Sequence, residues 1–279
     1  KKHKFNFTNT IDIDNAFAYL EKGFVRTFGS LVRDLLQFNF KKIKEKSQVF
    51  LSKRQDPYDH YNHLLSIHRK YNLKTIFFFL LADYGFNDKN INPSNRRLQT
   101  QIKEIADYCD IGIHASYSSL TNPDNLFKEI KRLENIINRE ITSNRQHFLF
   151  LNIPDNYRNL IKNGIKHDYS MGFASLPGFR AGTSYNFYFF DIMHSISTDL
   201  LIHPFSIMDA TLNDYMNLNS QDAFYLIKAL INEVKNVEGN FISIWHNESL
   251  DYTDRWLEWD NIYEDMIKYI VNEKNRVSA

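Results

Sequence analysis

The sequence predicts an α/β fold in which parallel strands form a barrel-like sheet covered by helices. Apolar, strand-like stretches alternate with helical segments along nearly the whole chain, which is the order typical of parallel sheets. Four of these stretches also end in polar clusters, at residues 10–14, 112–117, 145–147 and 244–247. Because the strand ends of a barrel meet at one face, the four clusters predict one shared pocket, built from residue types that bind metals.

Length and composition agree with this class. The 279 residues suffice for one barrel, and no linker or repeat divides them, so we predict a single domain over residues 1–279. A hydrophobic content of 43% excludes a disordered chain. The 34 basic and 33 acidic residues nearly balance, so we expect no nucleic-acid partner. The single cysteine, Cys109, excludes an internal disulfide and is interpreted as a half-buried structural thiol.

No targeting or membrane-spanning segment is visible in the sequence. The longest apolar run, residues 76–82, is far shorter than the roughly 20 residues of a membrane span. We therefore expect a soluble, cytoplasmic protein without a membrane span. The chain opens almost directly on a strand, which leaves open an N-terminal domain that is absent from this sequence.

The first half of the chain shows three strands and four helical stretches. Residues 5–14 form the first strand, with Thr10, Asp12 and Asp14 on one face. Residues 17–51 are mostly helical, with an apolar side, and a helix begins at Asp56-Pro57 and runs to about residue 71. The remaining expected elements are strand 74–81, helix 98–108, strand 110–114 and helix 126–138.

The second half continues the alternation. We expect a strand near 143–148, a helix over 155–163, a strand-like piece over 165–170 and a loop rich in Gly and Pro over 172–185. One or two strands follow within 191–205, then a long helix over 220–237, a last strand over 240–246 and a closing helix over 256–275.

The part of the chain at 23–53 is longer than a simple first-helix connection needs. A lid, a dimer contact and a dock for a missing N-terminal domain all remain open as its role. Its dense basic run, residues 41–46, is interpreted as a solvated helix face, with a membrane or polyanion contact as the alternative.

The strand-end residues suggest metal-assisted chemistry. Asp12 and Asp14 lie about 7 Å apart on one strand face, and two such acids repel each other unless a cation or basic partner stands between them. His114 and His147 are candidate metal ligands, and Arg145 could hold a carboxylate ionised. His246, where the last strand turns into a loop, could act as a general acid.

Further residues are candidates for binding a substrate. Arg180 lies between two glycines in the 172–185 loop and could contact a substrate or an anion, or serve only the loop structure. Asp168 ends a strand-like piece and could reach the pocket. The rings of Tyr117 and Trp245 lie near the proposed pocket in sequence and could stack on sugar rings.

In their order and spacing the four clusters resemble the motifs of the polysaccharide deacetylase family, the NodB-homology domain of carbohydrate esterases. That family has Thr-x-Asp-Asp on the first strand, His-Ser/Thr-x-x-His on the third, then Arg-x-Pro, and Leu-x-His near the end. The counterparts here lie at residues 10–14, 114–118, 145–147 and 244–246.

The resemblance implies a distorted (β/α) barrel with a divalent metal, usually zinc, that removes an N-acetyl group from a glycan or amino sugar. By position, Asp12 would be the general base and Arg145 would hold it. Asp14 and His114 would bind the metal, and His246 would protonate the leaving amine.

Three departures from the family pattern bear on these roles. Ile13 separates the two acids, so the base and the ligand could be exchanged. The family's second metal histidine is Ser118 here, and the proline of Arg-x-Pro is His147. We predict that His147 restores an Asp-His-His ligand set, with Glu248 and Asp168 as the other candidates. The alternative is a catalytically silent carbohydrate-binding domain of a polysaccharide pathway.

Overall fold

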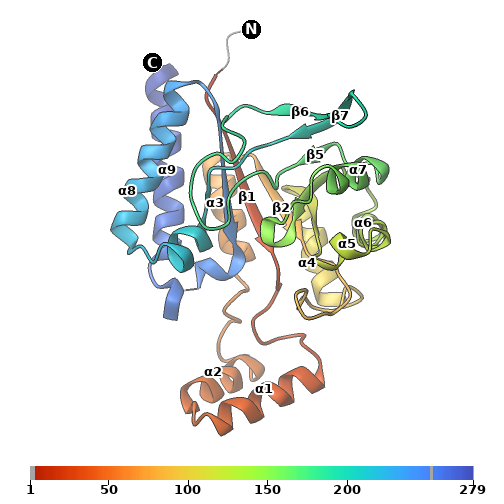
Figure 1. Cartoon of the computed structure of the whole chain (residues 1–279). Coiled ribbons are helices and arrows are strands. Elements are labelled where there is room, and N and C mark those ends of the chain that lie inside the picture. The colour runs from red at the N-terminus through yellow and green to blue at the C-terminus, as the bar shows by residue number, and fades with distance from the viewer. Residues whose placement is uncertain (1–3, 252–253, 279) are drawn as a thin grey trace.

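The computed structural model describes residues 4–251 and 254–278 and shows one mixed sheet surrounded by helices (Figure 1). The sheet has nine strands in the order β6-β7-β5-β4-β3-β2-β1-β9-β8, and every recorded pairing is parallel except β6 with β7. The strands are β1 (Asn6–Ile13), β2 (Thr75–Phe79), β3 (Asp110–Ala115), β4 (Ser143–Gln146), β5 (His167–Asp168), β6 (Phe187–Asp191), β7 (Ile196–Ile202), β8 (Ile207–Met208) and β9 (Asn240–His246).

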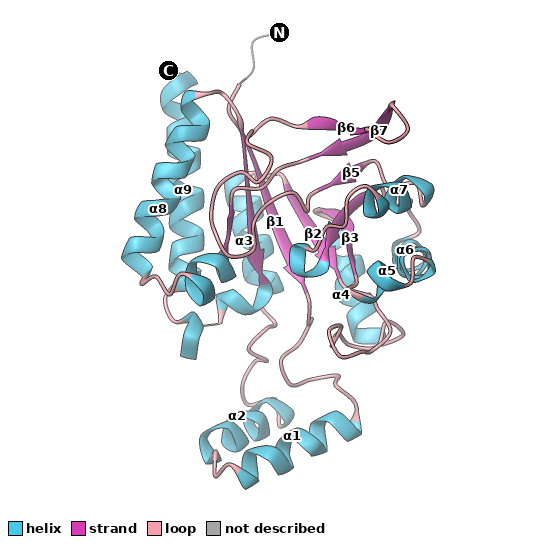
Figure 2. Ribbon diagram, viewed as in Figure 1, coloured by secondary structure: helices cyan, strands magenta, loops and turns pink. Residues whose placement is uncertain are grey.

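Helices connect most of the parallel strands, and Figure 2 shows all but the first two around the outside of the sheet. They are α1 (Phe24–Leu36), α2 (Phe40–Phe50), α3 (Tyr61–Tyr71), α4 (Arg96–Ala106), α5 (Ser118–Thr121), α6 (Asp124–Ile137), α7 (Asp155–Lys162), α8 (Ser220–Asn236) and α9 (Trp259–Ser278). The predicted α/β class is confirmed. Among the described residues, no helix has the length and apolar character needed to cross a membrane.

The barrel is distorted because its two ends do not pair. Within the described residues no ladder joins β8 to β6 or β7, and single backbone bonds cross this side instead. The amide of Gly178 donates to the carbonyl of Ser206 at 2.7 Å, and that of Phe205 donates to Met171 at 3.2 Å. Loop segments therefore complete the wall where a strand is missing.

The alternation of side chains along the strands builds two cores. The outward face of the sheet packs against the helices and includes Ile11, Phe77 and Trp245. The inward face forms a smaller cluster with Phe78 and Ile244 among its members. Above this inner cluster, toward the carboxyl ends of the strands, the inward positions become polar.

One glycine makes room for the inner core. A Cβ added to Gly112 would lie 2.5 Å from a carbon of the Phe78 ring and 2.9 Å from the carbonyl oxygen of Ser143. A side chain at this position would therefore displace the ring that fills the barrel centre.

The segment expected to be mostly helical over 17–51 is instead a hairpin of α1 and α2, broken at Gln37–Asn39. Figure 1 shows it standing apart from the rest of the molecule, beyond the carboxyl end of β1. Its apolar stripe faces outward, since Phe28 and Leu35 are 58% and 55% exposed. The interior of the hairpin is polar instead, with Lys46 and Asp34 buried as an ion pair.

Other element boundaries also differ from the predictions. The helix expected from Asp56-Pro57 begins at Tyr61, because the Asp56 carboxylate accepts hydrogen bonds from the backbone amides of Ala18, Tyr19 and Leu20 and so holds the preceding loop. The strand expected over 143–148 ends at Gln146, and the expected piece over 191–205 contains all of β7. Cys109 is half-buried as predicted, and burial raises its pKa to about 11.

Candidate metal centre

The sheet register brings the four polar clusters to one place. Asp12 of β1 lies opposite His246 of β9, and His114 of β3 lies opposite Arg145 of β4. These pairs belong to neighbouring parallel strands, so their side chains share the carboxyl end of the sheet. The first and last clusters, which are more than 200 residues apart in the sequence, are therefore adjacent in space.

Asp14, His114 and His147 form a compact ligand set just beyond these strand ends. His114 Nε2 lies 3.1 Å from Asp14 Oδ1, and His147 Nε2 lies 3.6 Å from Asp14 Oδ2. One ligand atom from each residue can be chosen so that all three lie within 4.8 Å of one another. Asp14 is partly exposed and the two histidines are buried, so the set opens to one side.

Each histidine is held by its other ring nitrogen. His114 Nδ1 lies 2.8 Å from the carbonyl oxygen of Arg145, which can only accept, so this nitrogen carries the proton. His147 Nδ1 lies 2.9 Å from Oδ1 of Asp88, a buried carboxylate. Both contacts direct the Nε2 atom of the ring toward Asp14, which is the arrangement that orients histidine ligands at metals.

The contact between Asp14 and His114 suits a shared cation. With Nδ1 directed at the Arg145 carbonyl, His114 turns Nε2 toward Asp14 Oδ1, a buried oxygen with no hydrogen-bond partner among the described residues. Two ligands of a tetrahedral metal with bonds of about 2.0–2.1 Å lie about 3.3 Å apart. The observed 3.1 and 3.6 Å bracket that value, so the residues fit a divalent ion.

The charges of the set reinforce one another. Burial raises the pKa of Asp14, but His147 and His114 outweigh it and hold that pKa well below its usual range. Burial likewise lowers the pKa of His147, while the Asp14 and Asp88 carboxylates raise it to about 9. Binding of a metal ion would therefore displace a proton from His147.

Asp12 lies beside this set in a different environment. Its Oδ2 is 3.6 Å from an Arg145 guanidinium nitrogen and 3.9 Å from His114 Nε2. Arg145 is fully buried between the rings of Phe78 and Phe205, and its second terminal nitrogen donates to the Thr10 hydroxyl at 2.8 Å. Asp12 thus faces a fixed positive charge, and its Oδ1 has no described hydrogen-bond partner.

His246 lies on β9, on the other side of β1 from the ligand set. Its Nδ1 lies 2.7 Å from Asp209 Oδ1, and its backbone amide donates to the other Asp209 oxygen. Burial lowers the pKa of His246, but the Asp209 carboxylate reverses this and raises it well above the ordinary value. The imidazole is therefore suited to hold a proton at neutral pH.

Aromatic rings border the ligand set. The Phe148 ring stacks on His147 with centroids 4.2 Å apart, and Tyr117 meets Phe148 edge-on at 5.9 Å. Phe148 is 55% exposed, and its φ of 59° lies in the left-handed region, where a bulky residue is strained. Beside it a cavity of about 280 Å³ is lined by Asp14, Asn15, Leu80, Phe86, Asn87, Lys89, His147 and Phe148.

Four of the residues considered from the sequence lie elsewhere. Trp245 is fully buried on the outward face of β9 and packs against Tyr263, so it is not available to a substrate and that expectation is wrong. Asp168 is buried, and its carboxylate is bonded to Asn144 and Ser170.

Arg180 and Glu248 are the other two. Arg180 is exposed in its loop, and within the described residues no recorded bond joins it to the ligand set. Glu248 pairs with Arg255 at 2.7 Å. The described structure therefore offers neither Glu248 nor Asp168 as a metal ligand.

Sequence reasoning missed Asp88, the buried partner of His147. Asp88 lies in an irregular loop nine residues after β2, at no motif spacing, and it also accepts the backbone amides of Tyr117 and Ser118. Asp209 also supports the site, and only the fold shows that it lies against His246. The exposed ring of Phe148 likewise carries no sequence signal.

Comparison with known proteins supports the fold. No protein-family profile matches the sequence, and no curated protein matches it. Two similar solved structures are provisionally described as polysaccharide deacetylases. The one from Mycobacterium smegmatis has a TM-score of 0.62 at 16% identity, over 97% of this chain and 85% of that one. The one from Pseudomonas aeruginosa PAO1 has a TM-score of 0.56 at 12% identity, over 95% and 84%.

A third solved structure has a different described activity. A 4-alpha-glucanotransferase from Thermococcus litoralis has a TM-score of 0.52 at 11% identity, over 97% of this chain and 38% of that one. At such identities the similarity establishes that the chain has the fold of polysaccharide deacetylases, and function must be argued from the site.

Proposed function

We propose that this protein is a metal-dependent hydrolase that removes an N-acetyl group from a glycan or amino sugar, as a divergent polysaccharide deacetylase. The observation that carries the proposal is the convergence of Asp14, His114 and His147, which can each place a ligand atom within 4.8 Å of the other two. His147, anchored by Asp88, supplies the third ligand in place of the family's second histidine.

Asp14, His114 and His147 would hold the ion, and their mixed oxygen and nitrogen donors suit zinc. When bound, such an ion polarises an acetyl carbonyl and lowers the pKa of a water molecule. Three protein ligands leave positions open for water and substrate, as catalytic zinc sites do.

The protein's own residues would move the protons. Asp12 would accept the proton of the attacking water, and Arg145, 3.6 Å away, would keep it ionised and oriented. This assigns the base to Asp12 and the ligand role to Asp14. His246, kept protonated by Asp209, would donate its proton to the leaving amine nitrogen. The products would be acetate and a free amino sugar.

The rings at the rim would bind the carbohydrate. Tyr117 and Phe148 present aromatic surface beside the ligand set, and Phe148 is more than half exposed. Aromatic faces stack readily on the apolar faces of sugar rings, so Tyr117 keeps its expected role and Phe148 takes the place of Trp245.

The test is the metal content of the purified protein by mass spectrometry, with His147→Ala and a matched His63→Ala variant from α3 alongside. We expect about one zinc-like ion per chain in the wild type and in His63→Ala, and none in His147→Ala. Acetate should be released from an N-acetylated chito-oligosaccharide by the variants that retain the metal and not by His147→Ala. No retained metal after dialysis against zinc would contradict the proposal and leave a silent carbohydrate-binding domain as the better account.

A further inference from the structure

The α1–α2 hairpin turns its polar side toward the body of the protein. A helix that packs on a domain for stability alone faces it with its apolar stripe. Here Phe28 and Leu35 are exposed, while Thr27, Ser30 and Arg33 line a cavity of about 470 Å³. The hairpin is therefore placed to build a polar cavity and not to extend the hydrophobic core.

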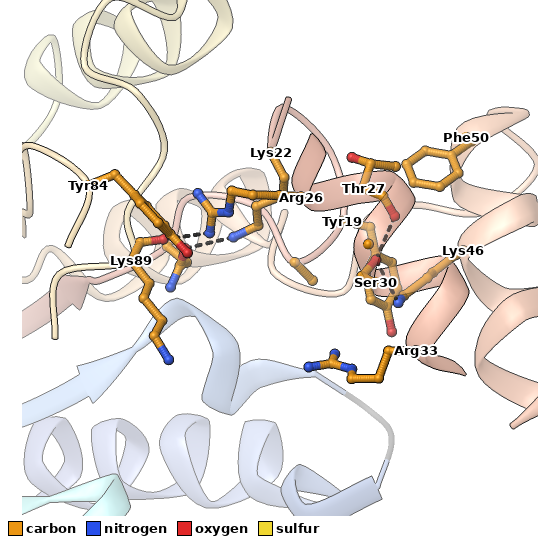
Figure 3. Close-up of a pocket in the computed structure, with 13 residues that line it drawn as sticks. Tyr19, Lys22, Arg26, Thr27, Ser30, Arg33, Lys46, Phe50, Tyr84 and Lys89 are labelled. Carbon is orange, nitrogen blue, oxygen red and sulfur yellow. Dashed lines mark hydrogen bonds between the residues drawn. The ribbon is translucent and has the colours of Figure 1, made fainter. Parts of the chain in front are cut away.

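That cavity is strongly basic, and Figure 3 shows the side chains that surround it. It is lined by Asn15, Ala18, Tyr19, Lys22, Arg26, Thr27, Gly29, Ser30, Arg33, Lys46, Phe50, Tyr84 and Lys89, which include five cationic residues and no carboxylate. Lys46 is neutralised by Asp34. Among the described residues no salt bridge pairs Lys22, Arg26, Arg33 or Lys89 with an acid.

The charge is concentrated in this part of the chain. Residues 23–54 contain eight Lys and Arg against two acids, a net charge of +6, whereas the whole chain carries +1. Both acids are already engaged, Asp34 by Lys46 and Glu45 by Arg54. Apart from Lys46, the cations that line the cavity thus have no salt-bridge partner among the described residues.

Two of the cations are fixed in position. Arg26 donates to the backbone carbonyls of Asn90 and Lys89 at 3.1 and 2.8 Å, and its guanidinium lies 4.4 Å from the centroid of the Tyr84 ring. Lys22 donates to the Asn15 side chain at 2.6 Å. Partial burial lowers the pKa of Lys22 to about 8, and Arg26 adds to that effect, so a bound anion would relieve repulsion between the two.

The basic cavity adjoins the candidate metal centre. Asn15 and Lys89 line both this cavity and the smaller one that contains Asp14 and His147. Asn15 directly follows Asp14 in the chain. A single molecule can therefore place an acetylated amine at the ligand set and a second group among the cations.

We propose that the cavity lined by Lys22, Arg26, Arg33 and Lys89 binds an anionic group, a phosphate or a carboxylate, carried by the substrate. This inference rests on the proposed function and deepens it, because it makes the substrate an acidic or phosphorylated amino sugar. Fixed arginines suit such groups, since their planar donors match the oxygens of both phosphate and carboxylate.

The test is calorimetric titration of the purified protein, which requires no turnover. The probes are N-acetylglucosamine, N-acetylglucosamine 1-phosphate and a disaccharide of N-acetylglucosamine and glucuronate. We expect at least one charged probe to bind about tenfold or more tightly than the neutral sugar. The stronger of the two charged probes identifies phosphate or carboxylate as the group bound.

Arg33→Gln tests the site, and Lys44→Gln, an exposed cation of α2 outside the cavity lining, is its control. We expect Arg33→Gln to weaken binding of the charged probe about tenfold and Lys44→Gln to leave it within twofold. If Arg33→Gln folds poorly, Lys89→Gln on the opposite side of the cavity provides the same test, and we expect it to weaken binding of the charged probe in the same way. Equal binding of charged and neutral probes, or equal effects of the Arg33 and Lys44 variants, would overturn the inference.

The two proposals fail separately. Charged-probe binding that depends on Arg33, in a protein that releases no acetate from any probe, would support the anion site and contradict the deacetylase. Acetate release from the neutral sugar, with no preference for charged probes, would support the deacetylase and overturn the anion site.

Discussion

Replacement of Asp88 by asparagine tests whether the ligand set is a metal site that depends on an outer carboxylate. Asp88 is 2% exposed and accepts from three groups: His147 Nδ1 at 2.9 Å and the amides of Tyr117 and Ser118 at 2.8 and 3.0 Å. An asparagine amide has one acceptor and one donor end, so in either orientation its NH2 group would face a donor. His147 loses its charged partner, and its Nε2 becomes a weaker ligand.

The expected loss is set by outer-shell effects at metal sites. Removal of such a carboxylate weakens metal affinity by about 10- to 100-fold. A tenfold loss corresponds to about 1.4 kcal/mol, which is of the size expected when a hydrogen bond to a charged group is lost. The free energy of unfolding of the metal-free protein should change less than the free energy of metal binding, because the asparagine can keep two of the three contacts that Asp88 makes.

The assay is zinc affinity by competition with a chromogenic chelator, with the melting temperature of the metal-free protein measured in parallel. Asp83→Asn is the matched control, because Asp83 lies in the same loop with a 71% exposed side chain paired to Arg132. Zinc affinity of a folded Asp88→Asn protein within twofold of the wild type would refute the reasoning. Equal losses of zinc affinity in Asp88→Asn and Asp83→Asn would also refute the reasoning.

Two further predictions concern the proton donor and the inner core. Asp209→Asn should lower the pKa of His246, because the Asp209 carboxylate raises it. Since a general acid must be protonated, the alkaline limb of the pH–rate profile should move to lower pH, and an unchanged limb would exclude His246 as that acid. Gly112→Ala should destabilise the protein by about 1–3 kcal/mol, since its Cβ would clash with the Phe78 ring. Gly29→Ala in α1, with no atom within 4 Å of its Cβ, should instead stabilise by about 0.5–1 kcal/mol, and thermal unfolding compares the two.

The alternating pattern of the sequence determined the fold class. Strand segments with a period of two, such as β1 and β9, place apolar residues on both sides of a sheet, and these two strands were predicted nearly to their observed bounds. The same period placed Asp12 and His246 on inward faces. The ligand candidates Asp14, His114 and His147 were also visible, because each belongs to a short polar cluster near a strand end.

Trp245 was misplaced for a related reason. Its neighbour His246 faces the site, and successive residues of a strand face opposite sides, so the ring of Trp245 enters the outer core. The period was available in the sequence, but proximity in the chain was given more weight. Aromatic surface at the site comes from Phe148 instead, which a tight turn after β4 exposes.

The carboxylates that hold the histidines of the site could not be predicted from the sequence. Asp88 and Asp209 act through residues 59 and 37 positions away, and nothing in their local pattern distinguishes them from other loop acids. The orientation of the hairpin also came only from the fold. Its apolar stripe was visible in the sequence, but the buried Lys46–Asp34 pair and the basic cavity occupy the inner side.

The sequence by itself determined most of the strand and helix segments, and which residue types stand at the strand ends, because side-chain periodicity is a local property of the backbone. Only the tertiary structure decided which acid meets which histidine, which carboxylates hold the rings, and which side of α1 faces the body. These depend on strand order, register and loop paths, which bring together residues that are distant in the chain and whose mutual contacts leave no local pattern.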